Sequence, residues 1–184
     1  MASFRGFIAI DIKVSKKIKE IINELEKSGA NLKLVKPEKM HITLKFLGET
    51  QESLIDKIKE NIEKSVENIE PFEIELKSTG VFPNEKYIKV LWIGIEKAQI
   101  IAEIEKKIDI ELSKIGFKKE KRKFSAHITI ARMKSGRNKD EILQILNKYK
   151  DESLLKMKVE EIKLKKSELT SKGPIYTTLK EIKI

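Results

Sequence analysis

Hydrophobic side chains recur with two different periods along the chain, and the switches between them predict where strands and helices lie. Residues 4–12 and 40–47 alternate apolar and polar side chains, as half-buried strands do. Residues 15–28 carry apolar side chains at helical spacing, with Ser15 placed to cap the first turn and Gly29 placed to end the helix.

The same two patterns predict the rest of the chain. They predict helices at residues 51–69, 98–115 and 139–149, and strands at residues 32–35, 72–81, 87–95, 124–133, 155–164 and 175–184. A turn is expected at residues 82–84 and a loop over residues 167–174. Helices and strands mix without the strict alternation of a doubly wound sheet, so the expected fold class is α+β. No Pro-, Gly- or Ser-rich linker divides the chain, so residues 1–184 are expected to form a single bilobal domain.

One tetrapeptide pattern occurs twice, and it contains the only two histidines of the chain. His41-Ile42-Thr43-Leu44 is matched 86 residues later by His127-Ile128-Thr129-Ile130. Residues i and i+2 of a strand point to the same side, so each tetrad should present an imidazole and a hydroxyl on one face and two aliphatic side chains on the other. The repeat predicts two related lobes with a pseudo-two-fold relation.

Composition narrows the class of protein. The chain has 184 residues, of which 40% are hydrophobic, enough for a folded core although 37% are charged. It has no cysteine, which excludes disulfides, thiolate metal sites and cysteine nucleophiles. No apolar run reaches transmembrane length, so a cytoplasmic protein with no membrane partner is expected. The abundance of Lys, Glu and Ile resembles thermophilic proteins, and an archaeal host is expected.

The positive charge is concentrated in one segment. The formal net charge is +10, and residues 117–137 hold eight basic side chains and one acidic one, which accounts for +7 of it. Such a field favours a polyanionic partner, with nucleic acid first. A solvated, lysine-rich surface explains the charge equally well, so charge alone leaves both interpretations open.

The paired tetrads suit acid–base chemistry on a phosphate ester. Imidazole titrates near neutrality, so a pair can supply one base and one acid at the same time. Hydroxyls can donate hydrogen bonds to phosphoryl oxygens without adding negative charge. Zinc would normally need a third protein ligand, and neither tetrad contains one, so no metal and no other cofactor is expected.

The two tetrads resemble the motifs of the 2H phosphoesterase superfamily. The chain as a whole is similar to the RNA 2′,3′-cyclic phosphodiesterases, a LigT-like family formerly called 2′-5′ RNA ligases. The segments that carry the resemblance are residues 4–10, 41–48, 81–83, 90–94, 124–132, 167–169 and 173–176. Ser125-Ala126 departs from the pair that is more usual before the second histidine.

The resemblance implies a fold and a reaction. The fold would be two pseudo-symmetric lobes, each an antiparallel sheet with helices outside, around a central cleft. In the reaction, water would open a terminal 2′,3′-cyclic phosphate of RNA and leave a 2′-phosphate, with no metal involved. His41 would protonate the departing 3′ oxygen, and His127 would accept a proton from the attacking water. Thr43 and Thr129 would bind the non-bridging oxygens. The substrate would be RNA with cyclic phosphate ends, tRNA fragments or cyclic nucleotides among them, and the enzyme a monomer.

Arg132 and Tyr176 are further candidates for substrate binding. Arg132 lies five residues after His127, on the opposite face of a regular strand, so a role in the cleft requires the strand to end or bulge there. Tyr176 either reaches the cleft or packs within a lobe. Phe46 is expected on the core side of its strand. Trp92 is expected in the core, with the stacking of a base as the alternative.

Two other functions stay open. The first is the joining of RNA ends, such as tRNA halves, through a 2′-5′ bond, which needs the same two histidines with a 5′-hydroxyl in place of water. The second is non-catalytic binding of RNA or nucleotides by the basic segment, which has no need of a matched pair of histidines.

Overall fold

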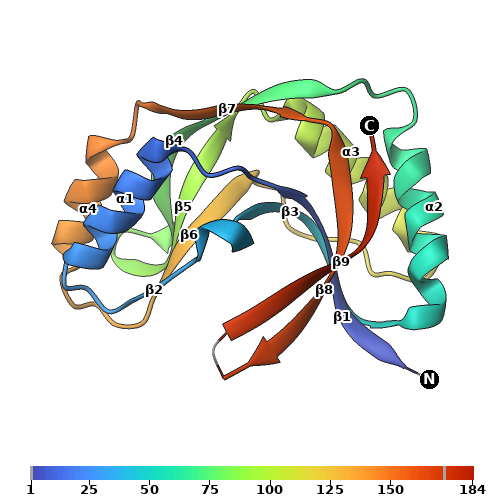
Figure 1. The fold of residues 1–184 in the computed structure, drawn as a ribbon, viewed down its shortest axis with the longest axis horizontal. Coiled ribbons are helices and arrows are strands. Elements are labelled where there is room, and N and C mark those ends of the chain that lie inside the picture. The colour runs from blue at the N-terminus through green and yellow to red at the C-terminus, as the bar shows by residue number, and fades with distance from the viewer. Residues whose placement is uncertain (1, 172) are drawn as a thin grey trace.

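The computed structural model describes residues 2–171 and 173–184, and within them a curved antiparallel sheet of nine strands carries helices on its outer sides (Figure 1). The strands are β1 (Ser3–Asp11), β2 (Leu32–Leu34), β3 (His41–Gln51), β4 (Phe72–Asn84), β5 (Tyr87–Glu96), β6 (His127–Met133), β7 (Ser153–Val159), β8 (Glu161–Thr170) and β9 (Gly173–Lys183). Their order is β7-β4-β5-β6-β3-β1-β8-β9, with β2 beside β6. The helices are α1 (Lys16–Lys27), α2 (Ile55–Val66), α3 (Gln99–Ser113) and α4 (Lys139–Lys148), with short 3-10 turns at Pro37–Lys39 and Glu52–Leu54.

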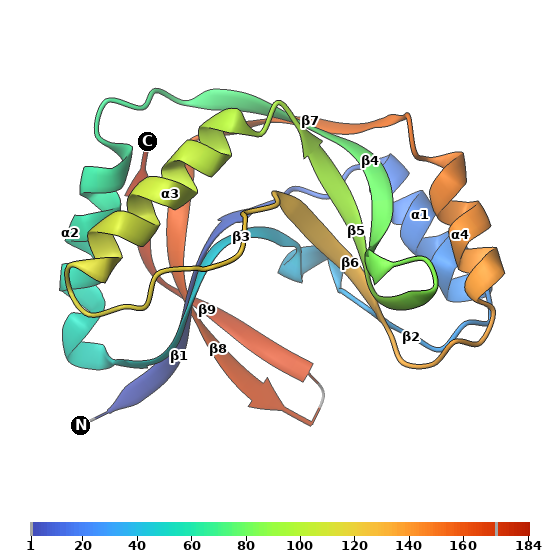
Figure 2. The same ribbon diagram turned by 180° about the vertical axis from the view of Figure 1, so that it is seen from behind.

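The helices are exchanged between the two halves of the chain. α1 packs with α4 on one side of the molecule, and α2 packs with α3 on the other (Figure 1 and Figure 2). Each half-sheet is therefore covered by one helix from the first half of the chain and one from the second. The two lobes expected from the tetrad repeat are present, and they interlock through their helices.

Local sequence explains where α1 forms. The Ser15 hydroxyl accepts a hydrogen bond from the main-chain N–H of Ile18 at 3.2 Å, which is the capping role predicted from the sequence. Ile18, Ile21 and Leu25 then lie on one face and are fully buried in the core. The predicted helix is confirmed to within a residue at each end.

The end of the chain differs from the sequence-based prediction. The strand expected over residues 155–164 is two strands, β7 and β8, which meet at Glu160. The loop expected over residues 167–174 is instead the tip of the β8–β9 hairpin, where Thr170 pairs with Gly173. This tip projects beyond the rest of the sheet (Figure 1), and Leu169 and Ile175 are 72% and 51% exposed. Because Glu168, Leu169 and Thr170 are all exposed, the alternation that marks other strands is missing at the end of β8.

The two half-sheets are joined where β3 meets β6. Ile42 pairs with Ile128 in an antiparallel register, and both side chains are buried in the core. These are the second residues of the two tetrads, so the joint brings the repeated motifs together at the centre of the sheet. No helix of the described residues is long and apolar enough to cross a membrane.

Candidate active site

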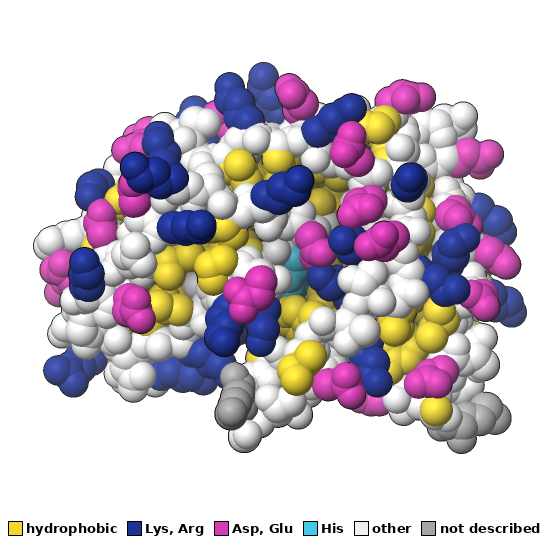
Figure 3. Space-filling model, viewed as in Figure 1, with side chains coloured by type: hydrophobic (Ala, Val, Ile, Leu, Met, Phe, Trp, Pro, Cys, Tyr) yellow, Lys and Arg dark blue, Asp and Glu magenta, His cyan; other side chains and the backbone are white. Residues whose placement is uncertain are grey.

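The two histidines and two threonines of the tetrads lie around the joint between the half-sheets. Because β3 and β6 run antiparallel through the Ile42–Ile128 pair, each histidine lies beside the threonine of the other tetrad. The aliphatic residues of both tetrads are buried, whereas the histidines and threonines are half-buried. The prediction that imidazole and hydroxyl share one face of each strand is confirmed. Figure 3 shows histidine surface recessed at the centre of the molecule, with lysine, arginine and carboxylate side chains around it.

Both imidazoles are held in the same way. Nδ1 of His41 lies 2.7 Å from the carbonyl oxygen of Lys39, and Nδ1 of His127 lies 2.7 Å from that of Ser125. A carbonyl oxygen can only accept, so each Nδ1 carries the proton and donates it. Nε2 of each ring is then the nitrogen that can exchange a proton with a substrate. The carbonyl of Ser125 comes from the main chain, so the unusual Ser125-Ala126 pair does not disturb this contact.

Aromatic rings fix the imidazoles further. The ring of Phe7 lies 5.1 Å from that of His41, and the ring of Phe82 lies 5.1 Å from that of His127. Tyr176 contacts His41 edge-on at 5.4 Å and also packs against Phe7. Of the two placements predicted for Tyr176, the structure therefore shows the one beside the histidines. The sequence does not single out Phe7, because an aromatic residue in a strand usually indicates core. It does not single out Phe82 either, because Phe82 falls in the predicted turn, which the structure shows to be the end of β4.

A β-bulge brings Arg132 to the face of the histidines. Trp92 pairs with Thr129 and Leu91 pairs with Ala131, so Ile130 is an extra residue in β6. Ile130 and Ala131 are consequently both buried, and Arg132 is exposed on the same side as Thr129. This is the irregularity that a role for Arg132 in the cleft requires.

The same bulge occurs in β3 and overturns the expected position of Phe46. Thr43 pairs with Ala9 and Lys45 pairs with Ile8, so Leu44 is the extra residue. Lys45 turns into the core at 7% exposure, and Phe46, expected in the core, is 69% exposed. The repeat interval of 86 residues makes Phe46 the counterpart of Arg132.

Trp92 was also expected in the core, and this is wrong. It is half-buried on the histidine side of β5, where its ring packs 5.3 Å from that of Phe82. Gly80 lies opposite it on β4, and a side chain at that position would overlap the indole ring. The indole Nε1 is buried and has no hydrogen-bond partner within the described residues.

Charged residues lie beside His41. Asp11 pairs with His41 across β1 and β3, and Lys165 donates to Asp11 at 2.6 Å. Burial lowers the pKa of the His41 imidazole below its ordinary value, and the positive charges of Lys165 and His127 lower it further. The Lys39 carbonyl and Asp11 act in the opposite direction. Asp11 was missed because the strand register, which is not visible within a single strand, places it there. Within residues 2–171 and 173–184, no three His, Cys, Asp or Glu side chains gather as a metal site.

Two imidazoles whose Nε2 atoms make no hydrogen bond within the described residues, with two hydroxyls related to each other by the symmetry of a bilobal sheet, define a two-histidine phosphoesterase. The chain belongs to the LigT-like phosphoesterase family, whose model matches it twice, over residues 8–92 and 93–176. Each match contains one tetrad, in agreement with the internal repeat.

Individual relatives agree with the family. The chain is 42% identical over 179 residues to the RNA 2′,3′-cyclic phosphodiesterase of Methanocaldococcus jannaschii, covering 96% of this chain and 99% of that protein. It is 35% identical over 182 residues to the protein of the same name from Methanothermobacter thermautotrophicus, with 98% of each covered. Among solved structures, a Thermus thermophilus protein superimposes with a TM-score of 0.77 over 97% of each chain at 24% identity, which shows that the fold is shared.

Proposed function

We propose that this protein hydrolyses 2′,3′-cyclic phosphate ends of RNA to 2′-phosphomonoesters, with His41 and His127 as acid and base and without a metal. The observation that carries the proposal is the matched pair of imidazoles, each with Nδ1 bound to a main-chain carbonyl and Nε2 left for the substrate. Two archaeal relatives named for this activity match nearly the whole chain, which supports the choice of substrate.

The reaction needs one proton to be taken and one to be given. His127 accepts a proton from water through Nε2 while the water oxygen forms a bond to phosphorus. The bond between phosphorus and the ribose 3′ oxygen breaks, and His41 donates its Nε2 proton to that oxygen. The product keeps its phosphate on the 2′ oxygen, and the two histidines exchange protons with solvent before the next turnover.

The threonines are suited to hold the phosphate. Neither the Thr43 nor the Thr129 hydroxyl makes a hydrogen bond within the described residues, so both are available to a ligand. A hydroxyl on each side can donate to a non-bridging oxygen, where negative charge increases in the transition state. Their position beside the histidine of the opposite tetrad would hold one phosphate between the two imidazoles.

Arg132 and Tyr176 would bind the rest of the terminal nucleotide. Burial raises the pKa of the Tyr176 hydroxyl, and the positive charges of Arg132 and Arg5 act against that rise. The planar guanidinium group is the side chain best matched to phosphate oxygens.

The lowered pKa of His41 bears on its role as the acid. In the free protein the neutral form of His41 is favoured, chiefly by burial. A bound cyclic phosphate brings a negative charge beside the ring, which favours the protonated form that a proton donor requires. The protonation of His41 is then linked to substrate binding. We expect the enzyme to act in the cytoplasm as a monomer, on RNA fragments such as those of tRNA.

Product analysis tests this function. A short RNA ending in a 2′,3′-cyclic phosphate is incubated with the protein in excess EDTA, and the product is separated against 2′- and 3′-phosphate standards. The expected product is the 2′-phosphate, at a rate that EDTA leaves unchanged. A 3′-phosphate product, or activity that returns only with a divalent cation, would contradict the proposal. Joined RNA in place of hydrolysis, when RNA with a 5′-hydroxyl is supplied, would favour the ligase alternative.

A further inference from the structure

The sequence predicts one continuous basic segment over residues 117–137. In the structure, β6 divides this segment into two parts. The loop from α3 to β6 holds one part at residues 118–123, and the other part lies beyond His127, from Arg132 to Arg137. The loop carries five cations and one carboxylate, namely Lys118, Lys119, Lys121, Arg122 and Lys123 with Glu120. Its last cation is four residues from His127, a span of at most roughly 14 Å.

We propose that the RNA strand leaves the active site over the α3–β6 loop, with the nucleotide next to the cyclic phosphate seated in a groove beside Phe46. This inference rests on the proposed function and adds the direction in which the substrate lies. Three observations support it: the contacts that hold the main chain of the loop, the cations of the loop that form no ion pair, and the groove.

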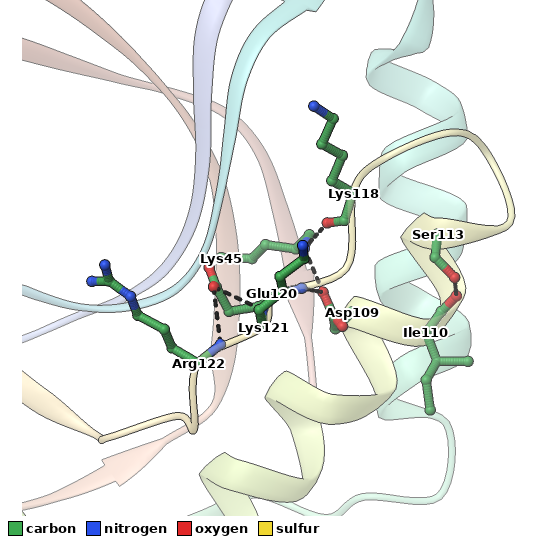
Figure 4. Close-up of polar contacts among 8 residues, drawn as sticks. All are labelled: Lys45, Asp109, Ile110, Ser113, Lys118, Glu120, Lys121 and Arg122. Atoms are coloured by element: carbon green, nitrogen blue, oxygen red, sulfur yellow. Dashed lines mark hydrogen bonds and ion pairs between the residues drawn. The ribbon is translucent and has the colours of Figure 1, made fainter.

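The loop is held in place from inside the protein. The buried Lys45 forms an ion pair with Asp109 of α3, and it also donates to the carbonyl oxygen of Lys118 at 2.9 Å. Asp109 in turn accepts the main-chain N–H of Glu120 at 3.0 Å (Figure 4). A loop held through its main chain needs no ordering when RNA binds, which lowers the entropic cost of binding.

The charge of the loop is left for a ligand. The Glu120 carboxylate accepts from the main-chain N–H groups of Lys121 and Arg122, at 3.0 and 3.3 Å. None of the five cations forms an ion pair with a carboxylate of the described residues. Figure 4 shows the side chains of Lys118 and Arg122 extending away from the Lys45–Asp109 pair. A set of unpaired cations on a fixed main chain suits the phosphates of a nucleic acid.

A groove of about 460 Å³ lies between this loop and the end of β3. Its lining includes the apolar side chains Phe46, Leu47, Leu54, Ile115 and Phe117 and the charged side chains Lys45, Glu49 and Lys118. The ring of Phe46 lies 6.5 Å from that of Phe7, which lies 5.1 Å from His41, so aromatic rings connect the groove to the active site. An exposed ring beside a row of cations is the usual platform for an unpaired base.

The opposite direction is less suitable. The counterparts of Lys45 and Phe46 in the other half are Ala131 and Arg132, which provide neither a buried lysine nor an exposed ring. The cavity at the far end of β6 is lined by Ser28, Gly136, Asn138, Lys139, Asp140 and Glu141, which hold two carboxylates for one cation and offer no ring for a base.

The test compares substrates of two lengths. kcat/KM is measured for cytidine 2′,3′-cyclic phosphate and for a tetranucleotide RNA with a 2′,3′-cyclic phosphate end. The loop variant is Lys121→Gln/Arg122→Gln/Lys123→Gln, and the matched control is Lys13→Gln/Lys16→Gln/Lys19→Gln, which removes three exposed, unpaired lysines at α1. The preference for the tetranucleotide should fall at least about tenfold in the loop variant and stay unchanged in the control. The salt dependence of the tetranucleotide reaction should weaken by about 0.7 in log–log slope per lost phosphate contact.

Phe46→Leu should lower the same preference by about five- to a hundredfold, the range for one stacked base. An unchanged preference in the loop variant, or an equal fall in the control, would overturn the inference. Should the wild type cleave neither substrate, the proposed function fails, and the loop is then tested by the binding of a tetranucleotide with a 2′-phosphate end. Weaker binding in the loop variant alone would uphold the inference, and equal binding in all proteins would overturn it.

Discussion

In both half-sites a histidine and a threonine share one face of a strand, and the histidine Nδ1 donates to a carbonyl oxygen two residues earlier. A phenylalanine ring lies 5.1 Å from each imidazole, and a bulge follows each tetrad. Beyond these shared features the half-sites diverge. Asp11 lies across from His41, whereas Gly94 lies across from His127. A side chain at Gly94 would come within 2.5 Å of the Ser78 hydroxyl, so this half-site has no room for a second carboxylate.

The difference separates two requirements of the proposed reaction. Both imidazoles need the same freedom at Nε2, and the shared features supply it. A fully symmetric site would bind an RNA end equally well in two opposite orientations, and only one of these places the 3′ oxygen at the acid. The unequal residues after the bulges, Lys45-Phe46 in β3 and Ala131-Arg132 in β6, remove this ambiguity by giving the RNA strand one direction in which to leave.

The largest effect is expected when Lys45, which follows the bulge in β3, is replaced by the residue found at the equivalent position of β6. Lys45→Ala installs the residue found at the equivalent position 131 and leaves Asp109, whose side chain is only 13% exposed, without its cation. Loss of one partner of a buried pair should lower the free energy of unfolding by about 3–5 kcal/mol, measured by urea denaturation at constant pH. The double variant Lys45→Met/Asp109→Asn removes both charges and should recover most of the loss. A Lys45→Ala protein as stable as the wild type would show that the pair does not hold the loop.

A smaller and equal effect is expected from the two threonines. Thr43→Val and Thr129→Val keep the branched shape and remove only the hydroxyl. Each should lower kcat/KM for the cyclic phosphate by about ten- to a hundredfold, the range for a hydrogen bond to a charged group. Because neither hydroxyl has a partner within the described residues, thermal stability should change little. A large effect from one threonine and none from the other would contradict an equal role for the two hydroxyls. Only the histidines would then have matching roles in the two half-sites.

The smallest effect concerns the titration of His41. Its pKa in the folded protein should lie below 6.5 in an NMR titration, and His127→Ala should raise it by removing a like charge. Inorganic phosphate should also raise it. Since the folded pKa is below the unfolded one, the contribution of His41 to stability is present above pH 6.5 and is lost as the pH falls through the folded pKa. A pKa for His41 above 6.5 in the free protein would contradict this description of its environment.

Features that depend on a single strand or helix could be predicted from the sequence. Features that depend on how two strands pair could not. The capped helix α1 and the shared face of His41 and Thr43 follow from local periodicity, and the structure confirms both. Phe46 was placed in the core because nothing in its own strand marks the bulge, which appears only when β3 is paired with β1. Arg132 shows the same dependence on a neighbouring strand. The hairpin of β8 and β9 was missed at its tip because the last three residues of β8 are all exposed, which leaves no hydrophobic alternation there.

The central claim is that His41 and His127 act as one unit on one phosphate, and a double-mutant cycle tests it most directly. Single-turnover rates on an RNA cyclic phosphate are compared for wild type, His41→Ala, His127→Ala and the double variant. Each single change should slow hydrolysis by about 10²–10⁴-fold, and the double variant should be no more than about tenfold slower than the slower single one. Wild-type rates in either single variant, or a double variant slowed by the product of the two factors, would contradict the claim.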